Sequence, residues 1–515
     1  MIVRPLETRL RANSTAVTWL IPLVIGGAVG LLVHLTTAER AMLLNDEGTF
    51  LDGGAGILRG AVPYRDFFAN SGPGTFWLLA MIFRLAGTTL RGARLLLAFD
   101  ISVLVGLTYW MTSRLAHRLT ALATSILCAA LLLSSPSNLV INHRWDSGAA
   151  MLLAIAAALA TLQSPRPTTA FLAGVFSAAA AWFTPPAGLV GAVIALRIWT
   201  EPKTRAVVMF HAIGLGTIAL LPATVLALQG GLLPMFRDLL WNASHYGSAN
   251  HVPYGFFFGG LAGLLKGAHG VEWAPRIVFA AAFLLPAWLP PLALALWLPR
   301  LRKSRPAESL LFACGVAAVA CNYPRWDLMH LLYIVPVFLV LTAVRLEGSP
   351  LPLLRTSVVV LLLLTLLQMS ALNLYADDRV PIDSPAGRVR LSSVDANSAR
   401  MALAHVKPGS SLFVFPYEPI FYFLTGAHNP TPYYWMQPGM MGDKDERLAI
   451  AALTEKPPAW VIYDEMPPEF YLRIWPDSDP SHLNMPSIEQ FFRERYVLRE
   501  SVRTPDGQLQ LLERR

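Results

Sequence analysis

The stretch "NDEGTFLDGGAGILRGAVPYRDF" (residues 45–67) follows directly on an apolar run, residues 17–36, that is long enough to cross a bilayer. Asp46 and Glu47 therefore stand side by side where a membrane helix ends. Ionisable side chains at this depth are costly unless they are paired or hydrated, and they mark functional sites more often than not. The two acids are the first candidates for chemistry in this chain.

The composition indicates a membrane protein. Of the 515 residues, 54% are hydrophobic and 14% are charged, and the mean hydropathy is +0.48. Soluble domains carry about 25% charged residues, so most of this chain must be surrounded by lipid. The net charge of +8 comes from Lys and Arg spread over short loops, which argues against a nucleic-acid partner. The three cysteines lie in apolar segments and form neither a metal motif nor a disulfide framework.

Apolar runs long enough to span a bilayer recur along the first 375 residues. They fall at 17–36, 94–113, 119–137, 147–163, 206–228, 276–298, 307–321, 328–345 and 354–375. A further segment, 169–199, is interrupted by "TPP" at 184–186, which predicts two helices meeting at this break. The sequence thus predicts about eleven transmembrane helices, the first of them retained rather than cleaved as a signal peptide.

The distribution of positive charge supports this count and sets the orientation. With a cytoplasmic N-terminus, the inner segments carry 15 Lys and Arg; these segments are 1–16, 114–118, 163–168, 197–205, 299–306 and 345–355. The short outer loops 138–146, 183–185 and 322–327 carry only two. Cytoplasmic loops are enriched in Lys and Arg, so we expect the C-terminus on the outer side.

Residues 37–93 form a large first outer loop in this topology. The run 74–87 is apolar but too short to span, and 47–58 has one apolar face at helical spacing. Both are expected to be helices lying in the outer interface.

Residues 376–515 differ in composition from the part before them, since they are richer in Asp, Glu and Pro and lack a spanning run. Strands are expected at 411–416, 459–465 and 508–513, and helices near 443–453 and 486–496. The length suffices for a separate domain. We therefore expect a transmembrane module (1–375) followed by a small extracytoplasmic α/β domain (376–515).

Polar residues gather at the outer ends of the predicted spans, which indicates a cavity in the outer leaflet. They are Asp46, Glu47, Arg144, Asp146, Thr184, Arg325, Asp327 and His330. Each acid also has a simpler explanation, because Asp46, Glu47 or Asp146 could cap a helix. Arg325 and Asp327 could form a structural ion pair. The aromatic-rich outer loop 229–275 fits either an interface belt or the acceptor side.

Several of these segments together resemble one family. "DEGTFLDGGAGILRG", "PYRDFF" and "GPGTFWLLAMIFRLAGTTLRGARL" are similar to the first outer loop of the GT-C glycosyltransferases that use polyprenyl-phosphate sugars, which include protein O-mannosyltransferase-like and lipid A aminoarabinose transferase-like enzymes. "RWDSGAAMLL" resembles their second outer acid, and "PRWDLMHLLYIVPVFLVL" resembles their late span. "LFVFPYEPIFYFLTGAHNPTPYYW" is similar to the outer domain of bacterial members.

The resemblance implies transfer of a hexosyl or pentosyl group, with inversion, in the bacterial inner membrane. Asp46 would be the general base, with Glu47 and Asp146 beside it, because a carboxylate can take the proton of the attacking hydroxyl. Asp46 and Asp146 would be the pair to hold a divalent metal, which some relatives use. Members often carry a lysine for the donor phosphate where this chain has Thr184. That task would fall to Arg65, Arg144, Arg325 or His330, since cations stabilise a departing phosphate.

Two other classes of protein fit the same composition. A polytopic lipid or sugar transporter also buries charges, although such proteins usually show repeat symmetry, and none is visible in this sequence. A non-catalytic membrane scaffold is the other alternative. The expected partners of the glycosyltransferase are a polyprenyl-phosphate sugar, membrane lipid and a lipid, glycan or protein acceptor.

Overall fold

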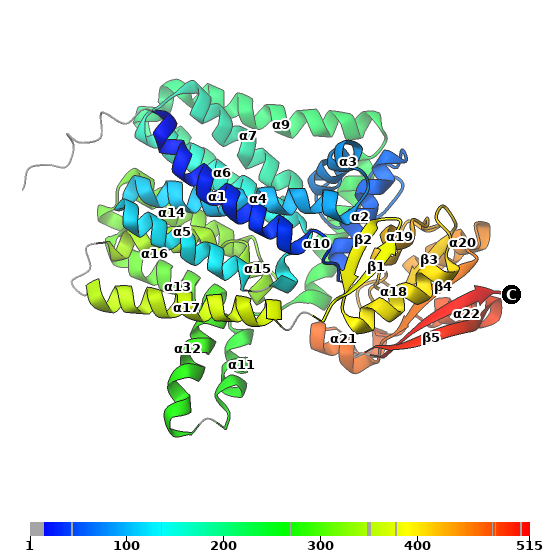
Figure 1. Cartoon of the computed structure of the whole chain (residues 1–515). Coiled ribbons are helices and arrows are strands. Elements are labelled where there is room, and N and C mark those ends of the chain that lie inside the picture. The colour runs from blue at the N-terminus through cyan, green and yellow to red at the C-terminus, as the bar shows by residue number, and fades with distance from the viewer. Residues whose placement is uncertain are drawn as a thin grey trace, which may run out of the picture.

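The computed structural model describes residues 15–42, 45–134, 136–267, 269–347, 352–375, 378–475, 477–478, 480–504 and 507–515. A bundle of long helices forms one end of the molecule, and a smaller part with helices and strands, which includes the C-terminus, forms the other (Figure 1). The predicted boundary between the two falls at residues 376 and 377, outside the described residues.

The helices up to residue 375 follow the apolar runs of the sequence. They are α1 (Thr15–Thr37), α2 (Asn45–Leu58), α3 (Gly74–Ala86), α4 (Leu90–Leu115), α5 (Arg118–Leu133), α6 (His143–Gln163), α7 (Pro167–Phe183), α8 (Gly188–Thr200), α9 (Val208–Leu228), α10 (Leu232–Asn250), α11 (Phe256–Leu265), α12 (Trp273–Phe283), α13 (Leu285–Trp297), α14 (Pro306–Ala320), α15 (Leu328–Leu332), α16 (Val335–Leu346) and α17 (Pro352–Tyr375). Five stretches of the described chain are helical, long and apolar enough to cross a membrane, or six if one bent pair counts as a single span. The count of eleven therefore stays a prediction.

The predicted break inside 169–199 is confirmed. Helices α7 and α8 are separated by a short 3-10 turn, Pro185–Ala187, directly after Thr184. Proline has no N–H to donate and its ring clashes with the preceding turn, so the two prolines end one helix and begin the next.

Two predicted straight spans are wrong in detail. Residues 276–298 form α12 and α13, which are bent by 77° relative to each other, and Pro286 stands in the first turn of α13. Residues 328–345 form α15 and α16, with Pro336 in the first turn of α16. In both places the proline cannot continue a preceding helix.

Segment 229–275, predicted as an outer loop, contains the helices α10 and α11. Helix α10 carries Leu232, Met235 and Leu239 at helical spacing, and α11 is a short apolar helix. The connection after α10 pairs with the loop after α14, since Val252 N–H donates to the Pro324 carbonyl at 3.0 Å. This pairing joins α10 to the residues that precede α15.

The two helices expected in the first outer loop are confirmed as α2 and α3. They pack closely because α2 is rich in glycine: a Cβ on Gly53 would lie 2.5 Å from the Phe76 ring. On another side of α2, a Cβ on Gly48 would lie 2.2 Å from the backbone nitrogen of Ile420. Only glycine permits these approaches, so α2 is held between α3 and the C-terminal part of the chain.

The C-terminal part contains the strands predicted near 412, 460 and 508, together with others that the sequence pattern did not reveal. Its elements are β1 (Val380–Ser384), β2 (Gly387–Leu391), α18 (Ser393–His405), β3 (Leu412–Phe415), α19 (Ile420–Thr425), α20 (Asp443–Glu455), β4 (Trp460–Glu465), α21 (Pro468–Ile474), α22 (Pro486–Arg495), β5 (Tyr496–Thr504) and β6 (Gly507–Arg514). The main sheet has the order β3-β4-β6-β5, with β3 and β4 parallel and the other pairs antiparallel.

The C-terminal part also contacts the residues that follow α1. The β1–β2 hairpin reaches the residues after α1, where Ala41 N–H donates to the Arg390 carbonyl at 3.0 Å and Arg390 N–H donates to the Glu39 carbonyl at 2.6 Å. Arg379 Nη1 adds a bond to the Ala41 carbonyl at 2.5 Å. The segment that leads to Asp46 is thus paired with the C-terminal part.

Candidate active site

Asp46 lies in the first turn of α2 and is held by the loop that precedes α6. Asn142 Nδ2 donates to Asp46 Oδ2 at 3.0 Å, while Asn142 Oδ1 caps α6 by accepting from the Arg144 N–H at 3.0 Å. Asp46 is exposed to solvent, yet burial among protein atoms raises the pKa of its carboxyl above the ordinary value, against the opposing effect of Arg144 and Arg325.

Arg325, Asp327 and His330 form a connected group at the start of α15. Arg325 Nε donates to Asp327 Oδ2 at 2.6 Å, and the other Asp327 oxygen caps α15 by accepting from His330 N–H at 2.8 Å and contacts His330 Nδ1 at 2.6 Å. Burial disfavours the charge on Asp327, but His330 and Arg325 outweigh it and hold the pKa of Asp327 well below its usual range. The predicted ion pair therefore exists.

Asp46 and the Arg325 group lie within electrostatic range of each other. Asp46 interacts electrostatically with Arg144, Arg325 and Asp327, and Tyr246 on α10 lies within reach of the same charges. Arg144 is oriented by a 3.0 Å bond from its Nη1 to Asn322 Oδ1. One accessible carboxylate thus lies near two guanidinium groups, an arrangement that fits a base beside a site for a negatively charged group.

A cavity of about 500 Å³ adjoins the Arg325 group. Much of its wall is apolar, with Phe256, Phe283 and Met369 contributed by α11, α12 and α17. Its polar lining includes Arg325 and Arg473, the second of which comes from α21 of the C-terminal part. This size and this mixture of surfaces are typical of sites for small ligands with an apolar body and a charged end.

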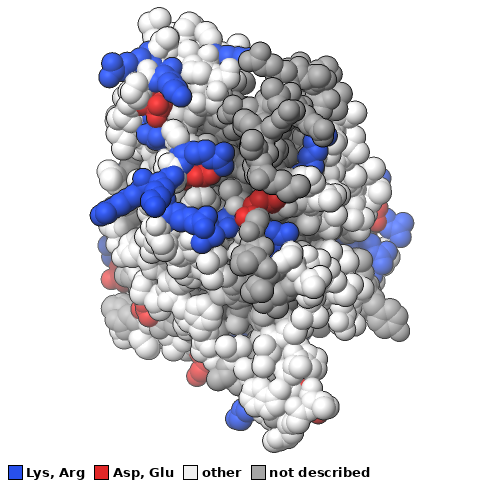
Figure 2. All heavy atoms as spheres, turned by 90° about the vertical axis from the view of Figure 1, so that its left-hand side faces the viewer, with Lys and Arg blue, Asp and Glu red and all other residues white. Residues whose placement is uncertain are grey.

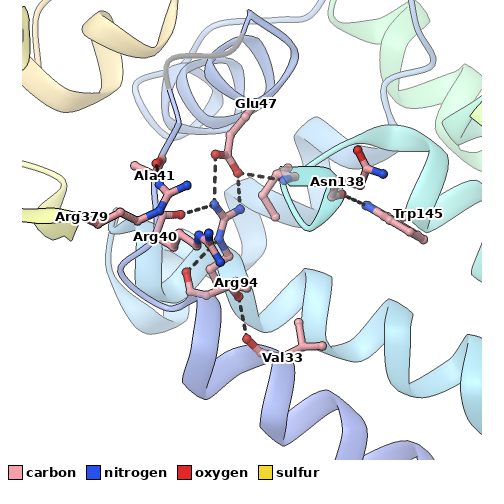
Figure 3. Close-up of polar contacts among 10 residues, drawn as sticks. Val33, Arg40, Ala41, Glu47, Arg94, Asn138, Trp145 and Arg379 are labelled. Atoms are coloured by element: carbon pink, nitrogen blue, oxygen red, sulfur yellow. Dashed lines mark hydrogen bonds and ion pairs between the residues drawn. The ribbon is translucent and has the colours of Figure 1, made fainter. Parts of the chain in front are cut away.

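Glu47 does not share the surroundings of its neighbour. Its side chain is completely buried, as is that of Arg94 on α4, and the two form an ion pair (Figure 3). Arg94 Nη2 donates to Glu47 Oε2 at 3.0 Å, and Arg94 Nη1 contacts Oε1. Successive residues of a helix point about 100° apart, so the two acids face different environments. In this arrangement only Asp46 is open to a substrate.

Asp146 is also buried, at 3% exposure. One of its carboxylate oxygens accepts from Thr75 Oγ1, and Asp100 of α4 lies beside it in the bundle interior. It lies in the first turn of α6, but the helix cap is supplied by Asn142 instead. The structure therefore separates the surroundings of Asp146 from those of Asp46.

Arg65 and Thr184, the remaining predicted site residues, have partners of their own. Arg65 is exposed, and its guanidinium group contacts the Asp66 carboxylate and the Gln229 carbonyl at the end of α9. Thr184 ends α7, and its hydroxyl lies 2.7 Å from His143 Nδ1. His143 is within the electrostatic influence of Arg144 and His330, so Thr184 lies next to the residues around Asp46 and Arg325. The contacts of Arg65 do not connect it to these residues.

The fold as a whole matches solved structures. A crystal structure of ArnT from Cupriavidus metallidurans in the apo state gives a TM-score of 0.58 at 14% identity, covering 97% of this chain and 98% of that chain. The same protein bound to undecaprenyl phosphate gives a TM-score of 0.56 with equal identity and coverage. The chain has the GT-C fold. No protein-family model and no curated protein matches the sequence.

The GT-C resemblance predicted from the sequence is thereby confirmed for the fold. The divalent metal implied by that resemblance is a separate question. The described residues contain no group of three or more His, Cys, Asp or Glu side chains placed to hold a metal ion. Because these residues offer Asp46 and Asp146 no such group of ligands, we derive no step through a metal.

Some residues of this candidate site were not predicted. Asn142, which orients Asp46, has a sequence signal, since Asn is a preferred helix cap and it directly precedes "HRWD". Arg94 also has a sequence signal, because a charged residue in an apolar run is costly without a partner. For Arg473 we find no such signal, since it lies far along the chain in a short polar helix.

Proposed function

We propose that the chain is a membrane glycosyltransferase that moves a sugar from a polyprenyl-phosphate donor to a lipid, glycan or protein acceptor at the outer face of the bacterial cytoplasmic membrane. One observation carries this proposal: the accessible Asp46 carboxylate, which Asn142 holds by a hydrogen bond, is within the electrostatic influence of Arg144 and Arg325, and Arg325 also lines the apolar-walled cavity. The donor class is supported by the fold shared with ArnT, which has been crystallised with undecaprenyl phosphate.

The proposed chemistry is a single displacement. The acceptor hydroxyl oxygen attacks the anomeric carbon, Asp46 takes the hydroxyl proton, and the bond from that carbon to the phosphate oxygen breaks with inversion. The polyprenyl phosphate leaves with the electron pair. Arg144 and Arg325 stabilise the charge that develops on it, since fixed cations in a partly dry site act strongly.

The cavity beside Arg325 is the binding site that we assign to the donor. Its apolar wall suits the first isoprenoid units, and Arg325 and Arg473 suit the phosphate, because guanidinium groups match phosphate oxygens in pairs. We assign the phosphate of the bound donor to Arg325 and Arg473, with Arg144 adding positive charge as the phosphate departs.

The proposal is tested with purified protein and radiolabelled polyprenyl-phosphate sugars. Appearance of the label on an acceptor in reconstituted inner-membrane lipid supports a transferase. Movement of the intact donor across vesicles without a new covalent product would instead identify a transporter. Absence of donor binding would leave the scaffold as the better explanation.

The phosphate assignment predicts a graded loss of donor affinity. Arg325→Ala is expected to weaken binding of the polyprenyl phosphate about 10- to 100-fold, since a hydrogen bond to a charged group is lost. Arg325→Lys keeps the positive charge but cannot donate two parallel hydrogen bonds, so it should lose less affinity for the donor than Arg325→Ala. Arg499→Ala, an exposed arginine on β5, is the control. Equal affinity in all three variants would place the phosphate elsewhere.

The proposal includes the eleven-span topology, with residues 1–375 as the transmembrane module and 376–515 as an extracytoplasmic domain. The face of the bundle opposite the C-terminal strands displays more Lys and Arg than Asp and Glu, as a cytoplasmic face would (Figures 1 and 2). In a variant without native cysteines, we expect Ser410→Cys to react with an impermeant thiol reagent from outside. Ser304→Cys should react only after permeabilisation. Reaction of both from outside would refute this topology.

A further inference from the structure

The Glu47–Arg94 pair lies directly behind the proposed base. Both side chains are completely buried, and they meet through two contacts between guanidinium and carboxylate (Figure 3). Arg94 also donates to the carbonyls of Thr37 and Arg40, at 3.2 and 2.7 Å. One guanidinium therefore connects the end of α1, the first turn of α2 and α4.

The same pair extends to the loop before α6. Glu47 Oε1 accepts the Ile141 N–H at 2.8 Å. Asp46 is bonded along the chain to Glu47, and its hydrogen-bond partner Asn142 is bonded along the chain to Ile141. The backbone that carries Asp46 and the backbone that carries its partner Asn142 are therefore both connected to the Glu47–Arg94 pair.

Stability alone does not account for such a pair. Removing two charges from water is costly, and a buried ion pair can often be replaced by apolar side chains of similar size without loss of stability. What apolar residues would not reproduce is the direction of the contacts to Ile141, Thr37 and Arg40. Transfer between bound groups depends on their geometry to within about 1 Å, so direction matters at this place.

We propose that Arg94 is a positioning residue, which acts through Glu47 and Ile141 to hold Asp46 within reach of the acceptor hydroxyl. This inference rests on the function proposed above. Arg94 and Glu47 touch no substrate in it. Arg94 holds Glu47, which directly follows Asp46 in α2. Glu47 in turn holds Ile141, the chain neighbour of Asn142, which donates to Asp46.

The test compares two double variants of equal chemistry. Glu47→Met with Arg94→Met removes both buried charges, and Glu39→Met with Arg91→Met removes the neighbouring pair, which is joined at 2.8 Å but is exposed by 26% and 66%. We expect the first variant to keep its fold and its affinity for polyprenyl phosphate while kcat falls about 100-fold. The control should keep kcat and KM.

Other outcomes decide against the inference. A folded Glu47→Met/Arg94→Met variant with the wild-type kcat would show that the pair is structural only. Should that variant fail to fold, Arg94→Lys replaces it, because lysine satisfies the buried charge but cannot make the same contacts in parallel. A wild-type kcat in folded Arg94→Lys would overturn the inference. Failure of the proposed function is distinguishable, since the unmodified protein itself would then transfer no sugar.

Discussion

Asp46→Asn is expected to lower kcat for sugar transfer by a factor of about 10² to 10⁴, which corresponds to about 3–5 kcal/mol of barrier. The amide has nearly the shape of the carboxylate, and its oxygen can still accept from Asn142 Nδ2 as Asp46 Oδ2 does at 3.0 Å. It cannot take the proton of the acceptor hydroxyl. Folding and donor binding should therefore change little, and the loss should fall on kcat.

The pH profile gives this variant a second readout. Burial raises the pKa of Asp46 above its usual range, and a base acts only when it is deprotonated. Activity of the wild-type protein should therefore fall as the pH drops through this raised pKa. The residual activity of Asp46→Asn should lack that acidic limb.

The control for Asp46→Asn is Asp383→Asn, an exposed carboxylate on β1, which should leave kcat and the profile unchanged. Normal turnover by Asp46→Asn would refute the proposed mechanism. A loss of donor binding equal to the loss of kcat would assign Asp46 to the donor site and not to the base.

Much of the fold was accessible from the sequence because its signals are local. The apolar lengths of α4, α6 and α9, the prolines between α7 and α8, and the glycine-rich α2 each specify their structure within a few residues. The bend at Pro286 and the break before Pro336 have the same kind of local signal, a proline in the first turn of the second helix, although each apolar run is long enough to span as one helix. Helix α10 was missed because its polar residues obscured its apolar face.

The site was less accessible, because its contacts join distant segments. Nothing near Glu47 in the sequence shows that Arg94 faces it, or that Asp146 meets Asp100 inside the bundle. Helical geometry alone shows that adjacent acids point in different directions, but it does not say which of Asp46 and Glu47 points outward. That choice depends on how α2 packs between α3 and the C-terminal part and on its ion pair with α4, which are tertiary properties.

Loss of one member of the Glu47–Arg94 pair is expected to have the largest effect on stability. Arg94→Ala leaves a carboxylate in the protein interior without its partner, which typically costs about 3–5 kcal/mol. Arg91→Ala removes an exposed arginine three residues away on the same helix and should cost at most about 1 kcal/mol. Both free energies of unfolding can be measured by denaturant titration in the same detergent.

The combined variant Glu47→Met/Arg94→Met should regain most of the stability that Arg94→Ala loses, since neither charge then remains buried without a partner. In this variant the free energy of unfolding should recover, because both buried charges are gone. The kcat should stay low, because the contacts to Ile141 and Arg40 are lost. If Arg94→Ala costs no more than Arg91→Ala, the pair is hydrated and cannot hold Asp46. If stability and kcat both recover in the double variant, apolar packing is enough to position Asp46. The directed contacts of the ion pair would then not be needed for catalysis.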